Sequence, residues 1–545
     1  MRFVLVSLFS ICIFCACGTM EPSRDQVDLI VYGGTIYTCD TAFGTAEAMV
    51  IDNGLVVATG TVKELFGSYN AEDSLDLDGK ACYPGLIDAH AHFRNYARQK
   101  LRVDLTGTKS WDECLERVRS FATRVTEGPI LGRGWDQNDW DTKEYPTNEE
   151  LNALFPNRPL ALTRIDGHAL VANDVALAIA KFNETTHIPG GELPTLDGKL
   201  TGVCIDKAED SLRRSLPEES KDQLAKAMIE AQGDLFAVGL TGLIDAGLPM
   251  ETIYFIDSLQ QIGSLSFPLQ IWAQAENREL DHFIEHGVYE TDLLTVRGFK
   301  VYCDGALGSR GAYLKEPYHD RHDWRGLLVT DSARLFEIAQ RIADSDFQLN
   351  THAIGDSGNA LVLSAYASVL DPKNDRRWRI EHAQVVTPTD YPSFKEYIVI
   401  PSVQPTHATS DMYWAEDRLG PERIAHAYAY SDLLDLHGWM PLGTDFPVER
   451  IDPKWTFYAA VFRQDVDGFP AGGFNGENRL SRREALLGMT LWAAKSGFWE
   501  GSRGSLEAGK RADFVVPSVD WMEAEATQIA DSQIELTYLI GKRVH

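Results

Sequence analysis

The middle of the chain alternates short apolar segments with longer amphipathic ones, and this alternation restricts the possible folds more than any other feature. Eight segments have the composition of strands, and they end at residues 88–90, 242–245, 269–272, 298–301, 348–352, 379–382, 398–403 and 440–445. Strands that alternate with helices predict parallel βα units, and this number of units can close a barrel. We therefore expect an α/β fold with a (β/α)8 TIM-type barrel over residues 84–499.

The first two candidate strands are separated by about 150 residues, which is too long for one crossover connection. We expect an inserted subdomain at about 100–230, after the first strand. The chain ends have a different pattern: Asn53-Gly54 between two apolar runs predicts a hairpin, and strand-like runs return only near the C-terminus. Residues 27–83 and 500–545 are therefore expected to form one discontinuous β-sandwich domain built by both chain ends.

The first residues resemble an export signal. Met1-Arg2 supplies a positive charge, and residues 3–14 are nearly all apolar but too few to span a bilayer. Cys17 follows a small residue at the end of this run, as in a bacterial lipobox. We expect a lipoprotein signal peptide at 1–17, a linker at 18–26, and a periplasmic or cell-envelope lipoprotein anchored at Cys17. An ordinary secretory signal with incidental cysteines is the alternative.

The net charge of the chain is −29, which repels nucleic-acid phosphates and anionic lipids. We expect a small-molecule substrate, no nucleic-acid partner, and membrane contact only through the N-terminal lipid anchor. The sequence leaves a homo-oligomer open. The cysteines beyond Cys17 lack the spacing of a disulfide framework or a zinc-thiolate site, so they are expected to be buried free thiols: Cys39, Cys82, Cys114, Cys204 and Cys303.

Residues able to bind metal stand at the ends of several predicted strands. His90 and His92 alternate on the first strand, so both imidazoles point to the same side. Four further strands end in Lys300, His352, His382 and Asp445. Imidazoles at the ends of apolar strands need partners, and one shared divalent cation would serve all of them.

Lys300 differs from the others because an ammonium group repels a cation. It fits a metal site only after reaction with CO₂, which turns the amine into a carbamate. The alternative is an ordinary lysine paired with Asp304 or with a surface carboxylate. Chemistry alone favours this alternative.

Several motifs occur in an order that is similar to one known family. They are PGLIDAHAH at 84–92, GRGWD at 132–136, DGHA at 166–169, KVYCDGALGSR at 300–310, THAIGD at 351–356, IEHAQ at 380–384, QPTH at 404–407, GTDFP at 443–447 and GSLEAGKRAD at 504–513. Together they resemble the amidohydrolase superfamily, in its YtcJ-like (amidohydrolase 3) branch, which includes N-substituted formamide deformylase. This resemblance extends over nearly the whole chain after residue 17.

The resemblance implies a barrel beside a β-sandwich, and one or two divalent metal ions, with zinc as the expected ion. It also implies a role for each strand-end residue: His90 and His92 bind the first metal, His352 and His382 bind the second, a carbamate on Lys300 bridges the two, and Asp445 contacts the first. Asp445 would also accept the proton of the attacking water, while the second metal, His382 or His407 polarises the substrate carbonyl.

Five further residues are candidates for substrate binding, although a structural role is equally compatible with each: Trp135, Asp136, His168, Asp304 and Asp411. Trp135 and Trp140 are expected on a polar loop that could cover the barrel mouth. The predicted function is metal-dependent hydrolysis of a non-peptide carbon–nitrogen bond, such as an amide, N-acyl or N-formyl bond. The alternatives are a deaminase or esterase on the same site, or a non-catalytic binding or regulatory protein on a hydrolase fold.

Overall fold

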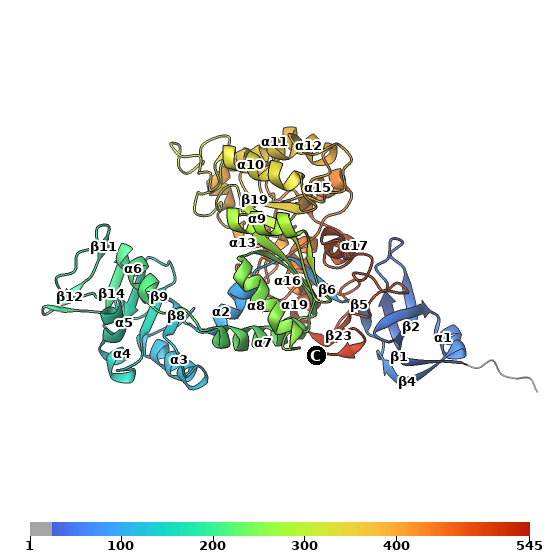
Figure 1. Ribbon diagram of the computed structural model, residues 1–545, viewed down its shortest axis with the longest axis horizontal. Helices are drawn as coiled ribbons and strands as arrows, with labels where there is room; N and C mark the ends of the chain where they lie inside the picture. Colours follow the sequence, from blue (N-terminus) through green and yellow to red (C-terminus); the bar gives the residue numbers. More distant parts are fainter. Residues whose placement is uncertain (1–23) are drawn as a thin grey trace, which may run out of the picture.

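The computed structural model describes residues 24–545 and contains three regions, a barrel, an inserted subdomain and a β domain (Figure 1). The predicted signal peptide at 1–17 lies outside the described residues, as does most of the predicted linker. The linker prediction is wrong at its end, because the first strand already begins at Asp25. None of the helices within 24–545 combines the length and the apolar character needed to cross a membrane.

Seven parallel strands form the wall of the barrel, and each pairs with the next in chain order. They are β6 (Leu86–Ala91), β15 (Leu240–Leu248), β16 (Leu269–Gln274), β18 (Leu294–Tyr302), β19 (Gln348–Ala353), β20 (Arg379–His382) and β21 (Ile400–Ser402). Each one overlaps a predicted segment, so the α/β class and the TIM-type barrel are confirmed. A short strand, β17 (Tyr289–Glu290), pairs antiparallel with β18.

The eighth predicted strand, at 440–445, is not a regular strand. Backbone hydrogen bonds nevertheless join this closing segment to both of its neighbours: from Gly443 N–H to Val403 O at 3.1 Å, and from Ala89 N–H to Leu442 O at 3.2 Å. Pro441 has no N–H to donate, so a continuous ladder cannot form here. A Cβ on Gly443 would lie 2.6 Å from the backbone nitrogen of His90, so only glycine allows the two chain segments to approach this closely.

Helices pack against the outside of the barrel. They include α8 (Met250–Gln261), α9 (Asn277–His286), α10 (Ser332–Ala343), α11 (Asp356–Ala367), α12 (Tyr391–Glu396), α15 (Tyr430–His437), α16 (Lys454–Phe462), α17 (Arg482–Gly488) and α18 (Leu491–Ser496). In α10, Leu335, Ile338 and Ile342 recur at helical spacing and are buried. The Asp331 side chain caps this helix by accepting a hydrogen bond from the Arg334 N–H at 3.0 Å.

The insertion leaves the barrel after β6 through α2 (Phe93–Lys100) and returns through α7 (Lys221–Ala237). Between these helices lies a six-stranded sheet of β7 (Arg102–Asp104), β8 (Ile130–Trp135), β9 (Leu160–Arg164), β10 (Ala169–Ala172), β11 (Gly191–Glu192) and β14 (Val203–Asp206). Its helices are α3 (Trp111–Arg124), α4 (Glu149–Leu154), α5 (Asp174–Ile179) and α6 (Lys207–Ser215). The subdomain has hydrophobic clusters of its own and lies to one side of the barrel (Figure 1).

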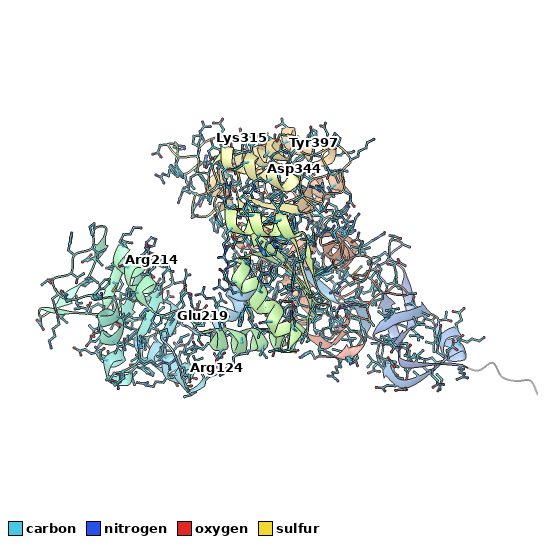
Figure 2. All side chains as sticks on the ribbon, viewed as in Figure 1. Arg124, Arg214, Glu219, Lys315, Asp344 and Tyr397 are labelled. Carbon is cyan, nitrogen blue, oxygen red and sulfur yellow. The ribbon has the colours of Figure 1, made fainter. Side chains whose placement is uncertain are left out.

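Ion pairs lie where the insertion meets the barrel, one between α2 and the residues just before α7 and one between α3 and α7. Arg98 Nε lies 2.6 Å from Glu219 Oε1, and Arg124 Nη1 lies 3.2 Å from Glu230 Oε2. Figure 2 labels Arg124 and Glu219 at this junction. These side chains are partly or largely exposed, so the pairs contribute little to stability.

Both chain ends contribute to a mixed β domain. The N-terminal part supplies β1 (Asp25–Tyr37), β2 (Thr45–Asp52), β3 (Leu55–Gly60), β4 (Tyr69–Asp76) and β5 (Ala81–Pro84), and the C-terminal part supplies β22 (Phe514–Pro517), β23 (Ile534–Leu539) and β24 (Lys542–Arg543). Strand β5 pairs with both β1 and β22, and side chains of the two arms share one core. Asn53 and Gly54 both have positive φ in the hairpin between β2 and β3, as predicted.

Candidate metal centre

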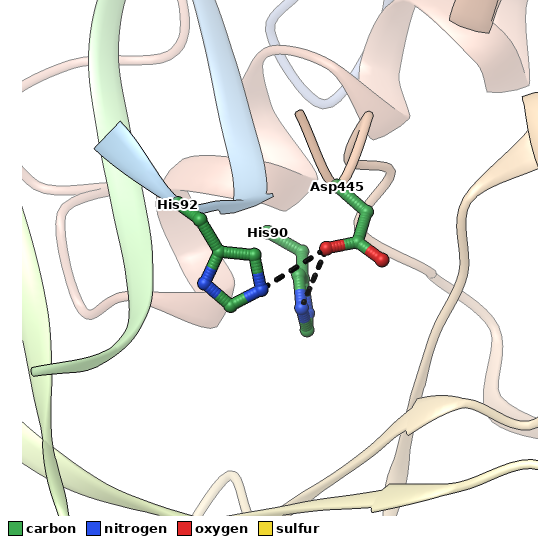
Figure 3. A group of neighbouring side chains, drawn as sticks. All are labelled: His90, His92 and Asp445. Atoms are coloured by element: carbon green, nitrogen blue, oxygen red, sulfur yellow. Dashed lines mark ion pairs between the residues drawn. The ribbon is translucent and has the colours of Figure 1, made fainter. Parts of the chain in front are cut away.

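The first group of candidate ligands lies where β6 ends. His90 is fully buried, and His92 stands two residues later, immediately before α2. Their Nε2 atoms lie 3.5 Å and 3.2 Å from Asp445 Oδ1 (Figure 3). Asp445 comes from the closing segment, and its N–H donates to His90 O at 2.8 Å. Barrel closure therefore brings this carboxylate to the two imidazoles.

A second group of candidate metal ligands lies next to the first. The ring centroids of His352 on β19 and His382 on β20 are 4.5 Å apart. His407, on α13 (Pro405–Asp411), stacks on His382 with ring centroids 5.6 Å apart. Its Nε2 lies 3.6 Å from Asp445 Oδ2. Asp445 thus belongs to two groups of potential metal ligands, one with His90 and His92 and one with His382 and His407.

Many ligand atoms of these groups are buried and lack a hydrogen-bond partner within residues 24–545: Nε2 of His90, His352 and His407, Nδ1 of His382, and Oδ1 of Asp445. An unpaired buried polar atom costs about 1–3 kcal/mol, so one such atom is unfavourable and a convergent set calls for a common partner. A divalent cation accepts imidazole nitrogen and carboxylate oxygen together. The residues present therefore fit a metal ion.

Electrostatics keeps these groups in the form that binds metal. Burial and the nearby Lys300 lower the pKa of His90 to about 4 and that of His352 to about 3. Burial also holds the pKa of His382 well below its ordinary value. Burial opposes ionisation of Asp445, but the surrounding imidazoles outweigh this effect and lower its pKa. The site therefore presents neutral imidazoles and an anionic carboxylate at neutral pH.

Residues 73–545 match the family model described as the amidohydrolase family. The chain belongs to this family. It is 32% identical to Protein LONG AFTER FAR-RED 3 of Arabidopsis thaliana, over 96% of this chain and 92% of that one. It is 29% identical to a putative amidohydrolase, YtcJ, of Bacillus subtilis strain 168, over 95% and 99% of the two chains. It is 25% identical to N-substituted formamide deformylase of Arthrobacter pascens, over 94% and 97%.

Among solved structures, an uncharacterised metal-dependent hydrolase from Pyrococcus horikoshii OT3 superimposes with a TM-score of 0.77 at 27% identity. The match covers 91% of this chain and 99% of the other. The predicted family, the fold class and the hydrolase class are confirmed by these similarities. The role of each individual residue stays a prediction.

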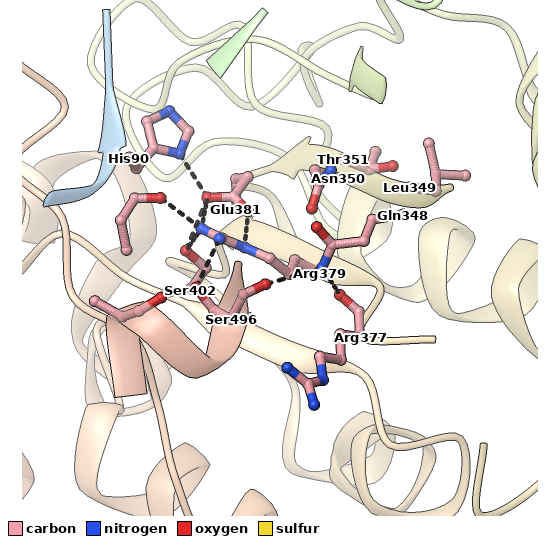
Figure 4. A network of polar contacts seen from close by, with 12 residues as sticks. His90, Gln348, Leu349, Asn350, Thr351, Arg377, Arg379, Glu381, Ser402 and Ser496 are labelled. Carbon is pink, nitrogen blue, oxygen red and sulfur yellow. Dashed lines mark hydrogen bonds and ion pairs between the residues drawn. The ribbon is translucent and has the colours of Figure 1, made fainter. Parts of the chain in front are cut away.

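A network of buried hydrogen bonds lies behind His90, and the sequence of this amidohydrolase did not predict it. His90 Nδ1–H donates to Glu381 Oε2 at 2.5 Å, and Glu381 Oε1 accepts from Arg379 Nε at 2.7 Å (Figure 4). Ser402 and Ser496 provide further hydrogen bonds to this pair. All of these side chains are fully buried. Because the Nδ1 proton is held by Glu381, the Nε2 lone pair of His90 is directed at the metal centre.

Lys300 of the amidohydrolase is 3% exposed and lies on β18. Burial lowers its pKa to about 8. No carboxylate of residues 24–545 pairs with it within 4.0 Å, and its Nζ instead lies 4.9 Å from the Tyr302 ring centroid. The alternative of a lysine paired with Asp304 is therefore not seen. Asp304 is buried and accepts backbone hydrogen bonds from residues 313, 354 and 355.

The expectation that Trp135 lies on a loop over the mouth is wrong. Trp135 ends β8 with no exposed surface, and its Nε1–H donates to Leu162 O at 2.7 Å. Trp140 is also buried in the same hydrophobic cluster of the insertion. A large apolar ring stabilises a small subdomain more when it is buried in the core than when it lies on a loop. The polar residues next to Trp135 in the sequence had suggested a loop instead.

The other candidates for substrate contact make hydrogen bonds of their own. Asp136 pairs with Arg164 at 2.6 Å, and His168 is largely exposed beside Asp206 at 3.0 Å, all within the insertion. Asp411 is different because it lies on α13, four residues after His407. It accepts hydrogen bonds from the Tyr428 hydroxyl at 2.7 Å and from Gln384 Nε2 at 3.2 Å, which orients the helix that carries His407.

Proposed function

We propose that this amidohydrolase uses a divalent metal centre to hydrolyse a non-peptide carbon–nitrogen bond in a small molecule. One observation carries the proposal: unpaired, buried nitrogen and oxygen atoms from four barrel positions and α13 converge on one space. The similarity to N-substituted formamide deformylase supports an amide, N-acyl or N-formyl bond as the target. A non-catalytic binding protein on the same fold would gain nothing from leaving these buried atoms without hydrogen-bond partners.

A bound divalent cation supplies hydroxide near neutral pH, because it lowers the pKa of water from 15.7 to about 7, and it polarises the substrate carbonyl. His90 and His92 would hold one ion and His352 and His382 a second, with zinc as the expected metal. Asp445 is ionised and lies within hydrogen-bond reach of this space, so it can accept the proton of the attacking water. It then returns the proton to the leaving nitrogen, while His407 and His382 orient the carbonyl.

We also propose that Lys300 carries a CO₂-derived carbamate. The uncharged amine would attack CO₂ and lose one proton to solvent, and the new carboxylate would supply anionic oxygen ligands to a metal. Its burial, its lowered pKa and its lack of an ion pair support this modification. Mass spectrometry of the intact protein under CO₂ would show a gain of about 44 Da, which Lys300→Met would abolish, and a metal count would then separate one ion from two.

The N-terminal sequence supports a separate proposal, a periplasmic or cell-envelope location with a lipid on Cys17. Labelling of expressing cells with a radioactive fatty acid tests it. Label in the wild-type protein that disappears in Cys17→Ser is the expected result. Unlabelled protein in the soluble envelope fraction would instead favour an ordinary secretory signal.

The decisive experiment for the reaction is a metal analysis combined with turnover of a substrate panel. The panel contains N-formyl and N-acyl amines, N-acyl amino acids, aryl esters and amino-heterocycles. We expect hydrolysis of at least one amide class in the metal-loaded protein and none after chelation. Turnover confined to esters or amino-heterocycles would establish the esterase or deaminase alternative. A metal-loaded protein inert toward all four classes would favour a binding function.

A further inference from the structure

A cavity of about 260 Å³ lies in the inserted subdomain, between its sheet and α6 (Figure 1). Leu131 and Arg133 alternate along β8, so their side chains point to the same face of the sheet. The strand register places Ala161 and Thr163 of β9 beside them. All four residues line the cavity, which is therefore built on one face of the sheet.

The charge of this cavity is unusual for so acidic a protein. The chain has a net charge of −29, yet cationic side chains outnumber carboxylates on the cavity wall. The charged lining residues are Arg102, Arg133, Arg213, Glu209 and Asp210. Because a guanidinium stays protonated at any physiological pH, this excess of positive charge is permanent.

Both carboxylates of the cavity are already paired with cations. Glu209 Oε1 lies 3.3 Å from Arg213 Nε. One oxygen of Asp210 lies 3.2 Å from Arg213 Nη2. The other lies 3.5 Å from both Lys207 Nζ and Arg214 Nη2. These two acids therefore do not neutralise the remaining two arginines of the cavity.

Arg102 and Arg133 stand among like charges. No carboxylate of residues 24–545 lies within 4.0 Å of either guanidinium, and Arg133 Nη2 donates to Ile165 O at 3.2 Å. Burial lowers the pKa of Arg102, three nearby arginines lower it further, and Glu219 opposes this shift without reversing it. Cations that converge on one space repel each other, so a ligand that brings negative charge would relieve the repulsion.

The rest of the wall offers apolar surface. Leu170 and Leu216 are buried, and half-buried Leu131 packs against the same hydrophobic cluster. At about 30 Å³ of liquid volume per water molecule, the cavity has room for about nine non-hydrogen atoms. Its shape and charge therefore fit a small molecule with anionic oxygen atoms at one end and an apolar body at the other.

We propose that this cavity binds a small organic oxyanion, a carboxylate or a phosphate ester with a short apolar body. Arg102 and Arg133 donate hydrogen bonds to its oxygen atoms, and each planar guanidinium can form two such bonds in parallel. The lining residues all belong to the insertion, whereas the candidate metal ligands belong to the barrel. The site is therefore separate from the metal centre and does not depend on the proposed reaction.

Isothermal titration calorimetry of the full-length, metal-loaded protein tests the site. The probes are hexanoate, its neutral isostere hexanamide, and n-butyl phosphate. We expect at least one anion to bind about 10- to 150-fold more tightly than hexanamide, the effect of a charged hydrogen-bonding partner. Tighter binding of hexanoate would identify a carboxylate ligand, and tighter binding of butyl phosphate would identify a phosphate ester.

Two variants connect this preference to the cavity. Arg102→Gln and Arg133→Gln should each weaken binding of the anion by about tenfold and leave hexanamide unchanged. Arg102→Lys should keep part of the affinity, because the charge remains without the planar fork. Both arginines are exposed, so the variants should fold, and their metal content checks this.

Arg124→Gln is the matched control, since it removes a positive charge from the same subdomain outside the cavity, where Arg124 pairs with Glu230. It should keep the full affinity for the anion. Hydrogen exchange should show protection of β7, β8 and α6 when the anion binds. The proposal is overturned if neither anion binds more tightly than hexanamide. It is also overturned if the affinity persists in Arg102→Gln and Arg133→Gln, since the anion would then bind elsewhere, as at the metal centre.

Discussion

The barrel mouth and the inserted subdomain both carry motifs that contain histidine and aspartate, yet the polar atoms of these motifs are arranged in opposite ways. At the mouth, ligand atoms of His90, His352, His382 and Asp445 are buried and unpaired. In the insertion, Asp136 is paired with Arg164, and the polar edge of the Trp135 ring with a backbone carbonyl. The convergence of unsatisfied buried atoms on one space, and not polar composition, is what supports the mouth as the site of the proposed chemistry.

Asp445→Asn is expected to have the largest effect on the mouth. The amide cannot accept the proton of the attacking water, so kcat should fall by about 10²- to 10⁴-fold. The metal content should change little, because the histidines remain. Steady-state kinetics and metal analysis on one preparation check this. Asp390→Asn, which alters a carboxylate paired with Lys315, serves as the control. Full activity in Asp445→Asn would rule out the assigned role.

Trp135→Ala is the counterpart in the insertion. Truncation of this fully buried ring should destabilise the subdomain by about 3–5 kcal/mol, because it leaves a cavity in the core. Metal content of the barrel should persist. Denaturant unfolding followed by tryptophan fluorescence measures the loss, and Trp135→Phe should recover most of it. Loss of kcat/KM without loss of stability would return Trp135 to a substrate role.

The metal-free protein should lose stability as the pH falls. Folding lowers the pKa of His90 from 6.5 to about 4, so the unfolded chain binds a proton in this window and the folded one does not. Stability is therefore complete above about pH 6.5 and falls by about 3 kcal/mol for this residue as the pH drops to about 4. Urea unfolding across this range tests the expectation, and a flat profile would contradict it. A metal ion that binds only the folded protein should reduce this loss of folding stability near pH 6.5.

Glu381→Gln should weaken metal binding by about 10- to 100-fold, because the group that orients His90 and balances Arg379 loses its charge. Competition with a chromophoric chelator measures the affinity. Glu500→Gln removes a carboxylate paired with Arg377 outside the site and should leave the affinity unchanged. Equal affinity in both variants would show that the network behind His90 is purely structural.

His168→Ala should have the smallest effect. The side chain is 75% exposed, and its partner Asp206 is exposed as well. Stability should stay within about 0.5 kcal/mol and kcat/KM within about twofold. A tenfold loss in kcat/KM would show that the insertion reaches the substrate during turnover, and the contrast between the two regions would then need revision.

Much of the barrel could be predicted because the signal is local. Seven strand segments and the strand-end placement of His90, His92, His352 and His382 follow from period-two alternation and chain order. The network behind His90 carried a weaker signal of the same kind. Arg379 and Glu381 alternate on β20, which places both inside the barrel, but nothing in the sequence shows that Glu381 meets a histidine 291 residues away.

By itself, the sequence determined the α/β architecture, the family and the set of side chains that meet at the strand ends. Only the tertiary structure decided which of them are unpaired, how residues 440–445 close the barrel by a few hydrogen bonds, and that Trp135 is a core residue. The reason is physical. Alternation depends on adjacent residues, whereas the pairing of a buried polar atom depends on atoms that are distant in sequence and are brought together only by folding.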